Sequence, residues 1–104
     1  MDIHVYMLRC SDGSYYVGIT RAGLEKRLSE HATGTFKGYT ATRRPVTLVW
    51  SQDFLTATDA ISCERRLNGW RREKKEALIR GDYSALRGLS QTARQNPRPS
   101  ASSG

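Results

Sequence analysis

The chain has 104 residues and a formal net charge of +7, which fits one basic domain with a single hydrophobic core. Its two cysteines, Cys10 and Cys63, lack the paired spacing of a zinc site and are too few for a disulfide framework. No apolar stretch reaches the roughly 20 residues that cross a bilayer, and the first residues do not resemble a signal peptide, so we expect a cytoplasmic protein without membrane contact.

The first two predicted elements form a β-hairpin. Residues Ile3 to Cys10 and Tyr15 to Thr20 are rich in β-branched and aromatic side chains, and the sequence Ser-Asp-Gly-Ser separates them. A two-residue turn would put Tyr6 and Tyr16 on opposite faces of the sheet, whereas a three-residue loop would put them on the same face. The Asp-Gly pair by itself favours the two-residue turn.

A short amphipathic helix is predicted next, over Ala22 to Thr33. Leu24 and Leu28 lie one turn apart on it with charged residues between them, and Gly34 is a suitable helix end. Residues 35–44 mix glycine, threonine, tyrosine and basic residues without periodicity. We therefore expect a loop there, which closes at a proline before the third strand.

The third strand is predicted over Val46 to Asp53, and a long helix follows it. Thr56, with an acidic residue three positions later, has the spacing of a capping box, and the helix should run to about Asn68. A further basic helix is expected within residues 70–80, with one more turn at 83–86. The order β-β-α-β-α-α indicates an α+β fold, in which helices flank a three-stranded antiparallel sheet.

Composition divides the chain into a domain over residues 1–88 and a tail over 89–104. The tail is rich in Ser, Gln, Asn, Pro and Ala, and we expect it to be disordered. It carries Arg94 and Arg98 and no acidic residue, so the excess positive charge belongs mainly to the domain. A basic domain is biased toward polyanions such as nucleic acid, because neutralising a phosphate releases condensed counterions.

One carboxylate is predicted to face inward. Glu64 falls on the apolar stripe of its helix, near Ala57, Ala60 and Ile61. Desolvating a carboxylate costs several kcal/mol unless a cation compensates it. The cation could be a metal ion or an arginine. Candidate arginines are Arg27, Arg65 and Arg66.

Two groups of residues on the first three elements are candidates for chemistry. Arg27 and His31 share one face of the first helix, and the pair suits a phosphate group or a solvated helix surface. Tyr6 and Tyr16 lie on strands, where most tyrosines pack in a core. His4 has no evident partner, and we assign it a structural role.

The order of these residues resembles the GIY-YIG nuclease superfamily. Val5-Tyr6-Met7 and, ten residues later, Tyr16-Val17-Gly18 match the paired tripeptides that give the superfamily its name, although the first lacks its Gly and Ile. The remaining positions follow in the family's order: Arg27, His31 and Glu64. The resemblance covers about residues 2–81 and is greatest to the small stand-alone members. Asn68 departs from it, since related small proteins often have a lysine there.

The resemblance implies a metal-dependent endonuclease that hydrolyses phosphodiester bonds in DNA, or in RNA, and that selects structure rather than sequence. Glu64 would bind one Mg²⁺ or Mn²⁺ ion. Arg27 would offset charge on the phosphoryl oxygens. Tyr6 or Tyr16 would accept a proton from the attacking water, and His31 would assist proton movement or contact the phosphate. Which tyrosine acts as the base stays open.

Basic residues near the last two helices are predicted to bind nucleic acid. They are Arg65, Arg66, Arg71, Arg72, Lys74 and Lys75. No DNA-reading module accompanies the domain, so a protein partner could supply targeting. Two other functions fit the same residues: a nucleic-acid-binding module that has lost catalysis, and a structural role with Trp50 and Trp70 in a contact surface.

The implied mechanism decides between the two hairpin turns. Both tyrosines can serve one site only if they share a sheet face, so we predict the three-residue loop. Cys10 should then pair with Ser14 and Leu8 with Tyr16, and Gly13 should have a positive φ. Both hydroxyls are expected to open on one pocket with the other candidate residues, Arg27, His31 and Glu64.

Overall fold

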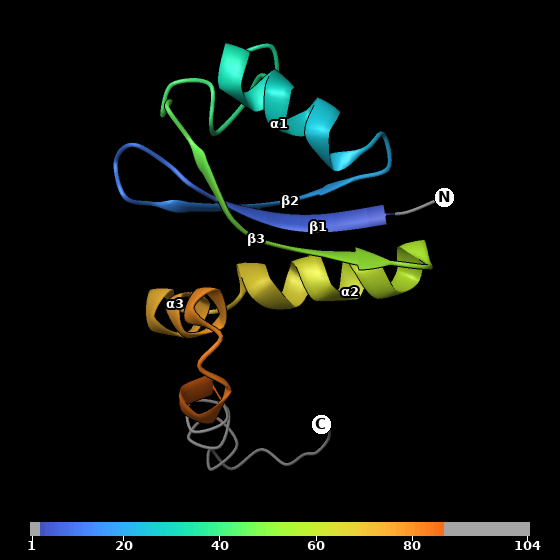
Figure 1. Cartoon of the computed structure of the whole chain (residues 1–104), viewed down its shortest axis with the longest axis vertical. Helices are drawn as coiled ribbons and strands as arrows, with labels where there is room; N and C mark the ends of the chain where they lie inside the picture. Colours follow the sequence, from blue (N-terminus) through green and yellow to red (C-terminus); the bar gives the residue numbers. More distant parts are fainter. Residues whose placement is uncertain (1–2, 87–104) are drawn as a thin grey trace. The chain divides into compact units, whose positions relative to one another are not determined.

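The computed structural model describes residues 3–86, which divide into two compact units, one ending at Gly69 and one beginning at Trp70. The elements are β1 (Ile3–Arg9), β2 (Tyr15–Thr20), α1 (Leu24–Thr33), β3 (Thr47–Phe54), α2 (Ala57–Asn68) and α3 (Arg72–Arg80) (Figure 1). Residues 83–86 form one more helical turn. The predicted element order and α+β class are confirmed. The tail expected over residues 89–104 lies outside the described residues.

The sheet of the first unit has β1 at its centre, in the order β2-β1-β3, and both pairings are antiparallel. Side chains on both faces of β1 are buried: Val5 and Met7 on one face, Tyr6 and Leu8 on the other. Two helices provide this burial, since α1 and α2 cover opposite faces of the sheet (Figure 1). The face that carries Tyr6 lies under α1.

The hairpin has the predicted three-residue loop. Leu8 pairs with Tyr16, the Cys10 N–H donates to the Ser14 carbonyl at 2.8 Å, and Gly13 has φ 84°. The side chain of Asp12 explains why this loop prevails over the tighter turn. It accepts hydrogen bonds from the Ser14 N–H at 3.0 Å and from Arg43 Nε at 3.1 Å, so contacts distant in sequence override the local preference.

The ends of the helices follow their sequence signals closely. Helix α1 begins at Leu24, two residues later than predicted, and ends as predicted at Gly34, whose φ is 81°. The Thr56 hydroxyl accepts a hydrogen bond from the Asp59 N–H at 3.2 Å, as the capping-box spacing predicts. In the second unit, α3 ends at Gly81 with φ 71°. Glycine is favoured at both ends because only it adopts the left-handed conformation without steric cost.

The apolar stripe of α2 is rotated from its predicted position. Ala60 and Leu67 are its buried residues, whereas Ile61 is 41% exposed. Glu64 is therefore half-buried at the margin of the stripe instead of lying at its centre. The prediction that Ile61 faces inward is wrong, because the helix turns this side toward the open edge of β2.

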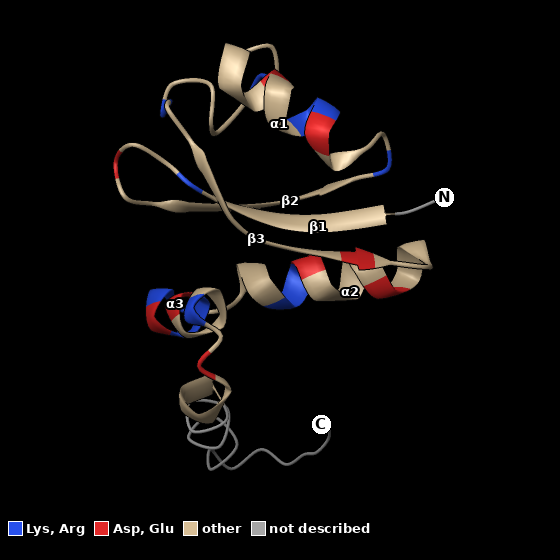
Figure 2. Cartoon of the chain, in the orientation of Figure 1, with Lys and Arg blue, Asp and Glu red and all other residues tan. Residues whose placement is uncertain are grey.

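Charged residues lie mainly on the helices and connecting loops, and the strands are largely free of them (Figure 2). Helix α3 carries both signs, including an ion pair between Arg72 and Glu76 at 3.0 Å. None of the helices within residues 3–86 is long and apolar enough to cross a membrane.

Candidate active site

A buried chain of three polar side chains lies between α1 and the sheet. Tyr6, His31 and Thr40 have no exposed surface. The Tyr6 hydroxyl is 2.9 Å from His31 Nε2, and His31 Nδ1 is 2.7 Å from the Thr40 hydroxyl. His31 therefore contacts Tyr6 from within the core and exposes no surface in this conformation, and its assistance to proton movement or phosphate contact stays a prediction.

Gly18 makes room for the Tyr6 side chain. The two residues are paired across β1 and β2, and the phenol of Tyr6 lies over the Gly18 backbone. A Cβ atom at residue 18 would be 2.5 Å from the Tyr6 hydroxyl oxygen and 2.8 Å from Cε2 of Tyr16. The final residue of Tyr16-Val17-Gly18 is thus a glycine because any side chain would occupy the volume of both tyrosines.

Tyr16 connects this buried chain to the surface. Its ring centroid lies 6.2 Å from that of Tyr6 and 5.4 Å from that of His31, and its side chain is half-buried. It lines a pocket of about 380 Å³ together with Glu64. The other residues that line this pocket are Tyr15, Val17, Tyr39 and Asn68. Of the two candidate tyrosines, Tyr16 is the one that shares a pocket with the candidate metal ligand.

Glu64 has no cationic partner among the described residues. Its side chain accepts a hydrogen bond from the Asn68 amide one turn later, and no Lys or Arg of residues 3–86 lies within ion-pair distance of it. The sequence left two cations that could compensate the charge of Glu64, an arginine or a metal ion, and within residues 3–86 no arginine is ion-paired with it. Arg65 and Arg66 instead lie exposed on α2.

A hard divalent cation fits this environment. The described residues contain no cluster of three or more His, Cys, Asp or Glu that could enclose an ion, so Glu64 would be the single protein carboxylate. Mg²⁺ is commonly held by one or two carboxylates while it keeps several waters and binds substrate phosphates. The pocket at Glu64 is open to solvent and has room for these ligands.

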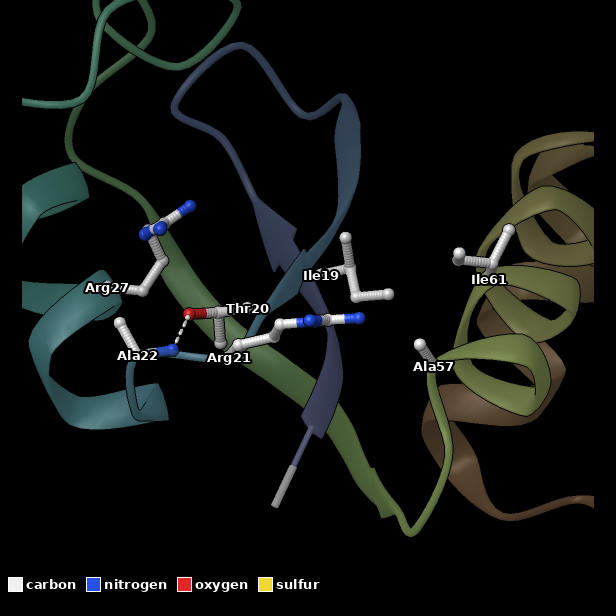
Figure 3. A pocket seen from close by; sticks show the side chains of 7 residues that line it. All are labelled: Ile19, Thr20, Arg21, Ala22, Arg27, Ala57 and Ile61. Atoms are coloured by element: carbon white, nitrogen blue, oxygen red, sulfur yellow. Dashed lines mark hydrogen bonds between the residues drawn. The ribbon is translucent and has the colours of Figure 1, made fainter. Parts of the chain in front are cut away.

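Arg27 belongs to α1, which covers the sheet face opposite to the one covered by α2 and its Glu64. Arg27 lines a second pocket of about 410 Å³, whose wall also includes Arg21, the residue after β2, and Ile61 from α2 (Figure 3). Its Nε is 3.0 Å from Glu30 Oε1, but that N–H does not point at the oxygen, so the contact is an ion pair without an aligned hydrogen bond. Its Cζ lies 5.1 Å from the centroid of Phe36.

The expectation of one shared pocket is therefore only partly met. Tyr16 and Glu64 line one pocket and Arg27 lines its neighbour, whereas Tyr6 and His31 are buried beneath them. The two pockets are lined by successive parts of β2, residues 15–17 and 19–20. An extended substrate along this edge could contact both.

Burial sets the ionisation of the inner side chains. Desolvation raises the pKa of Tyr6 well above its usual range, and the neighbouring Tyr16 raises it further, while the Arg27 charge lowers it. Desolvation also raises the pKa of Tyr16, whereas the Tyr6 hydroxyl and the charge of Arg27 lower this pKa. Burial and then Arg27 lower the pKa of His31. All three side chains are neutral at neutral pH.

The loop over residues 35–44 supplies contacts that the sequence did not reveal. Phe36 packs against His31 with ring centroids 4.3 Å apart, and Tyr39 stacks on Tyr16 at 6.1 Å with an interplanar angle of 22°. The guanidinium of Arg43 lies 3.9 Å from the Tyr39 ring centroid. A loop without periodicity gives no sequence signal for such contacts, so these residues and Thr40 were not candidates.

The predicted nucleic-acid-binding residues fall in two units. Arg65 and Arg66 are exposed on α2 of the first unit. The other four, Arg71, Arg72, Lys74 and Lys75, belong to the second unit. There the ammonium of Lys74 lies 4.5 Å from the Trp70 ring centroid, and burial lowers the pKa of Lys75.

Comparison with known proteins gives one consistent family. Residues 2–77 match the family model described as the GIY-YIG catalytic domain. A UPF0213 protein of Bacillus pumilus is 42% identical over 76 residues, which cover 73% of this chain and 76% of that protein. A UPF0213 protein of Halobacterium salinarum is 41% identical over 76 residues, covering 73% of this chain and 97% of that protein.

Two solved structures share the fold. The solution structure of a UPF0213 protein from Bacillus halodurans has a TM-score of 0.51 and 32% identity, covering 94% of this chain and 100% of that one. The solution structure of a protein from E. faecalis has a TM-score of 0.53 and 29% identity, covering 97% and 96%. These structures support the arrangement of strands and helices described above.

Replacing Gly18 with alanine should disturb the Tyr6 side chain. The added Cβ would overlap the Tyr6 hydroxyl, and overpacking of this kind lowers the free energy of unfolding by about 1–3 kcal/mol. Urea denaturation measures the change. Gly69→Ala is the matched control, because its nearest contact would be 3.6 Å and its φ of −86° suits alanine. Equal stability of Gly18→Ala and the wild type would contradict the close approach.

The folded protein should lose stability as the pH falls below about 6.5, the usual pKa of histidine. The pKa of His31 is lower in the folded protein than in the unfolded chain. As the pH falls, the unfolded chain therefore takes up a proton at His31 before the folded protein does, and unfolding becomes more favourable. Urea midpoints at about pH 7.5 and about pH 5.5 measure this loss, which should shrink in His31→Gln. His4→Gln, which leaves His31 in place, should keep it. The idea fails if His31→Gln and the wild type lose equal stability.

Proposed function

The chain belongs to the GIY-YIG catalytic-domain family, and from that premise we propose that it is a metal-dependent endonuclease that hydrolyses phosphodiester bonds in nucleic acid. We propose DNA in preference to RNA, recognised by structure rather than base sequence, with any targeting supplied by a protein partner. The observation that carries the proposal is Glu64, a half-buried carboxylate without a cationic partner among the described residues, in the same pocket as Tyr16.

A single Mg²⁺ or Mn²⁺ ion held by Glu64 would polarise the scissile phosphate and stabilise the departing oxygen. A water molecule attacking the phosphorus must lose a proton, and Tyr16 is the candidate base because its phenol borders the pocket. Since this phenol is neutral at neutral pH, it would first release its own proton to solvent, a loss that the charge of Arg27 and of a bound cation would favour. Tyr6 lies beside Tyr16, with ring centroids 6.2 Å apart, and its hydroxyl lowers the pKa of Tyr16. Tyr6 is thus assigned a supporting role, since it has no exposed surface.

Arg27 is proposed to offset charge on the phosphoryl oxygens. Its guanidinium already acts electrostatically on both tyrosines and lowers the pKa of each. The Arg27 side chain, which is ion-paired with Glu30, is about a quarter exposed and lines the neighbouring pocket. A phosphodiester that spans the two pockets would contact this side chain while its scissile bond lies at Glu64.

Replacing Glu64 with glutamine should slow divalent-dependent cleavage by about 10²-fold or more, because the amide removes the charge that holds the ion. Glutamine still accepts the hydrogen bond from Asn68, so the fold should be kept. The assay uses labelled single-stranded, branched and duplex substrates with Mg²⁺. Glu25→Gln, an exposed carboxylate on α1, is the control. Salt-sensitive binding without cleavage by the wild type would favour the inactive binding module instead.

Neutralising two exposed arginines should weaken binding without affecting the chemical step. Arg65→Gln with Arg66→Gln should flatten the slope of log K against log salt by about 0.9 for each lost contact to duplex phosphate. Titrations at several salt concentrations measure the slope. Arg80→Gln, whose side chain is ion-paired with Asp82 at 3.6 Å, is the control. Unchanged affinity with reduced turnover would show that these arginines do not bind phosphate.

A further inference from the structure

The pocket that Arg27 lines has a second arginine, which the proposed mechanism does not use. Arg21 follows β2 directly, and its exposed side chain lines the same pocket of about 410 Å³. The backbone around it is held locally, because the buried Thr20 hydroxyl accepts a hydrogen bond from the Ala22 N–H at 3.1 Å. Figure 3 shows Arg21 extending toward α2, while Arg27 lies on the side of α1. The two cations therefore border the pocket from different elements.

The charge of this pocket suits a phosphate group. Arg21 takes part in none of the ion pairs among residues 3–86, and the described residues that line the pocket include no acidic side chain. The guanidinium of arginine offers a rigid fork of donors that matches phosphate oxygens. A phosphate can therefore reach Arg21 without displacing a carboxylate from it.

Much of the remaining lining of the pocket is apolar. Ile19 of β2 contributes to it, as do Ala57 and Ile61 of α2. Ile61 is 41% exposed, so this pocket is where a large aliphatic side chain meets water. A phosphate alone would leave that apolar surface hydrated, whereas the flat face of a nucleobase would cover it. Cationic and apolar groups together thus match a whole nucleotide.

We propose that this pocket is a nucleotide subsite, in which Arg21 binds a phosphate of the substrate strand and the two isoleucines, Ile19 and Ile61, contact the adjacent base. The base must be unpaired, since a base inside a duplex is enclosed by its stacked neighbours and cannot reach these side chains. The inference rests on the proposed function, because it names the substrate class of the same site: nucleic acid that is single-stranded beside the scissile phosphate.

The strand β2 sets the distance between the two pockets. Tyr16 lines the pocket of Glu64 and Thr20 lines the nucleotide subsite. At the rise of an extended strand these two residues are about 13 Å apart. Successive nucleotides of one strand are separated by at least about 3.4 Å, so the subsite lies no more than about four nucleotides from the scissile phosphate.

Binding of two labelled oligonucleotides of about 12 nucleotides tests the proposal without cleavage. One is an oligothymidylate, the other is an abasic strand of equal length, and EDTA removes divalent ions from both titrations. Arg21→Gln should weaken binding of both strands by about 3- to 10-fold and flatten the slope of log K against log salt by about 0.7, the value for one lost phosphate contact on a single strand. Lys26→Gln is the control, because Lys26 is an exposed cation of α1 that does not line the pocket, and it should keep the wild-type affinity and slope. An unchanged slope in Arg21→Gln, or the same change in both variants, overturns the proposal.

Ile61→Ser should act on the base alone. It should weaken binding of oligothymidylate by about 3- to 10-fold, with little effect on the abasic strand or on the salt slope, because only an apolar contact is lost. Leu55→Ser is the matched control, since Leu55 is 89% exposed and does not line the pocket. Equal effects of Ile61→Ser on the two strands would contradict a contact with the base and overturn the nucleotide subsite.

Cleavage with Mg²⁺ separates this inference from the proposed function. On a cleaved single strand, Arg21→Gln should lower kcat/KM through a raised KM, as expected for a contact made before and during the chemical step. If the wild type cleaves no substrate while the variants change binding as described, the proposed function fails and the subsite stands. Cleavage by the wild type with unaltered binding in Arg21→Gln and Ile61→Ser overturns the subsite alone.

Discussion

The hydroxyl of Tyr6 lies inside the protein, over the backbone of Gly18, and must find every hydrogen-bond partner there. An unpartnered buried hydroxyl would cost about 1–3 kcal/mol, so the surrounding elements are constrained to supply partners. His31 of α1 does so at 2.9 Å, and the charge of Arg27, one turn earlier on the same helix, lowers the pKa of the phenol. The position of α1 on the sheet is thereby coupled to one phenol, and the loop after α1 is coupled to the imidazole through Thr40.

This coupling separates the candidate site into an inner and an outer part. The inner side chains are desolvated, and their pKa values favour the neutral forms, so they orient hydrogen bonds without carrying charge at neutral pH. The outer side chains, Tyr16 and Glu64, border an open pocket that water and an ion can enter. Neutral polar groups that are fixed behind an accessible phenol need little reorganisation when charge develops on that phenol.

The fold was largely predictable from sequence because its signals are local: alternating apolar residues in the strands, the Thr56 cap, and glycines at the helix ends. The hairpin was different, since Asp-Gly alone favours the shorter turn, and only the requirement that both tyrosines share a face selected the observed register. The rotation of α2 and the Asp12–Arg43 contact depend on tertiary packing. Thr40 was missed because a buried polar residue in an aperiodic loop looks like any surface threonine.

The residue one turn after Glu64 affects how strongly the pocket attracts a cation. A lysine at residue 68 would lie at i+4 from the glutamate, the spacing at which oppositely charged side chains pair on a helix. Asn68 instead gives a neutral hydrogen bond to one carboxylate oxygen, so the carboxylate keeps its full negative charge and its other oxygen. With Asn68, the protein has no positive charge at this position that could contact a substrate phosphate. It keeps an uncompensated carboxylate. In the proposed reaction, water and substrate would fill the remaining ligand positions of a cation bound to that carboxylate.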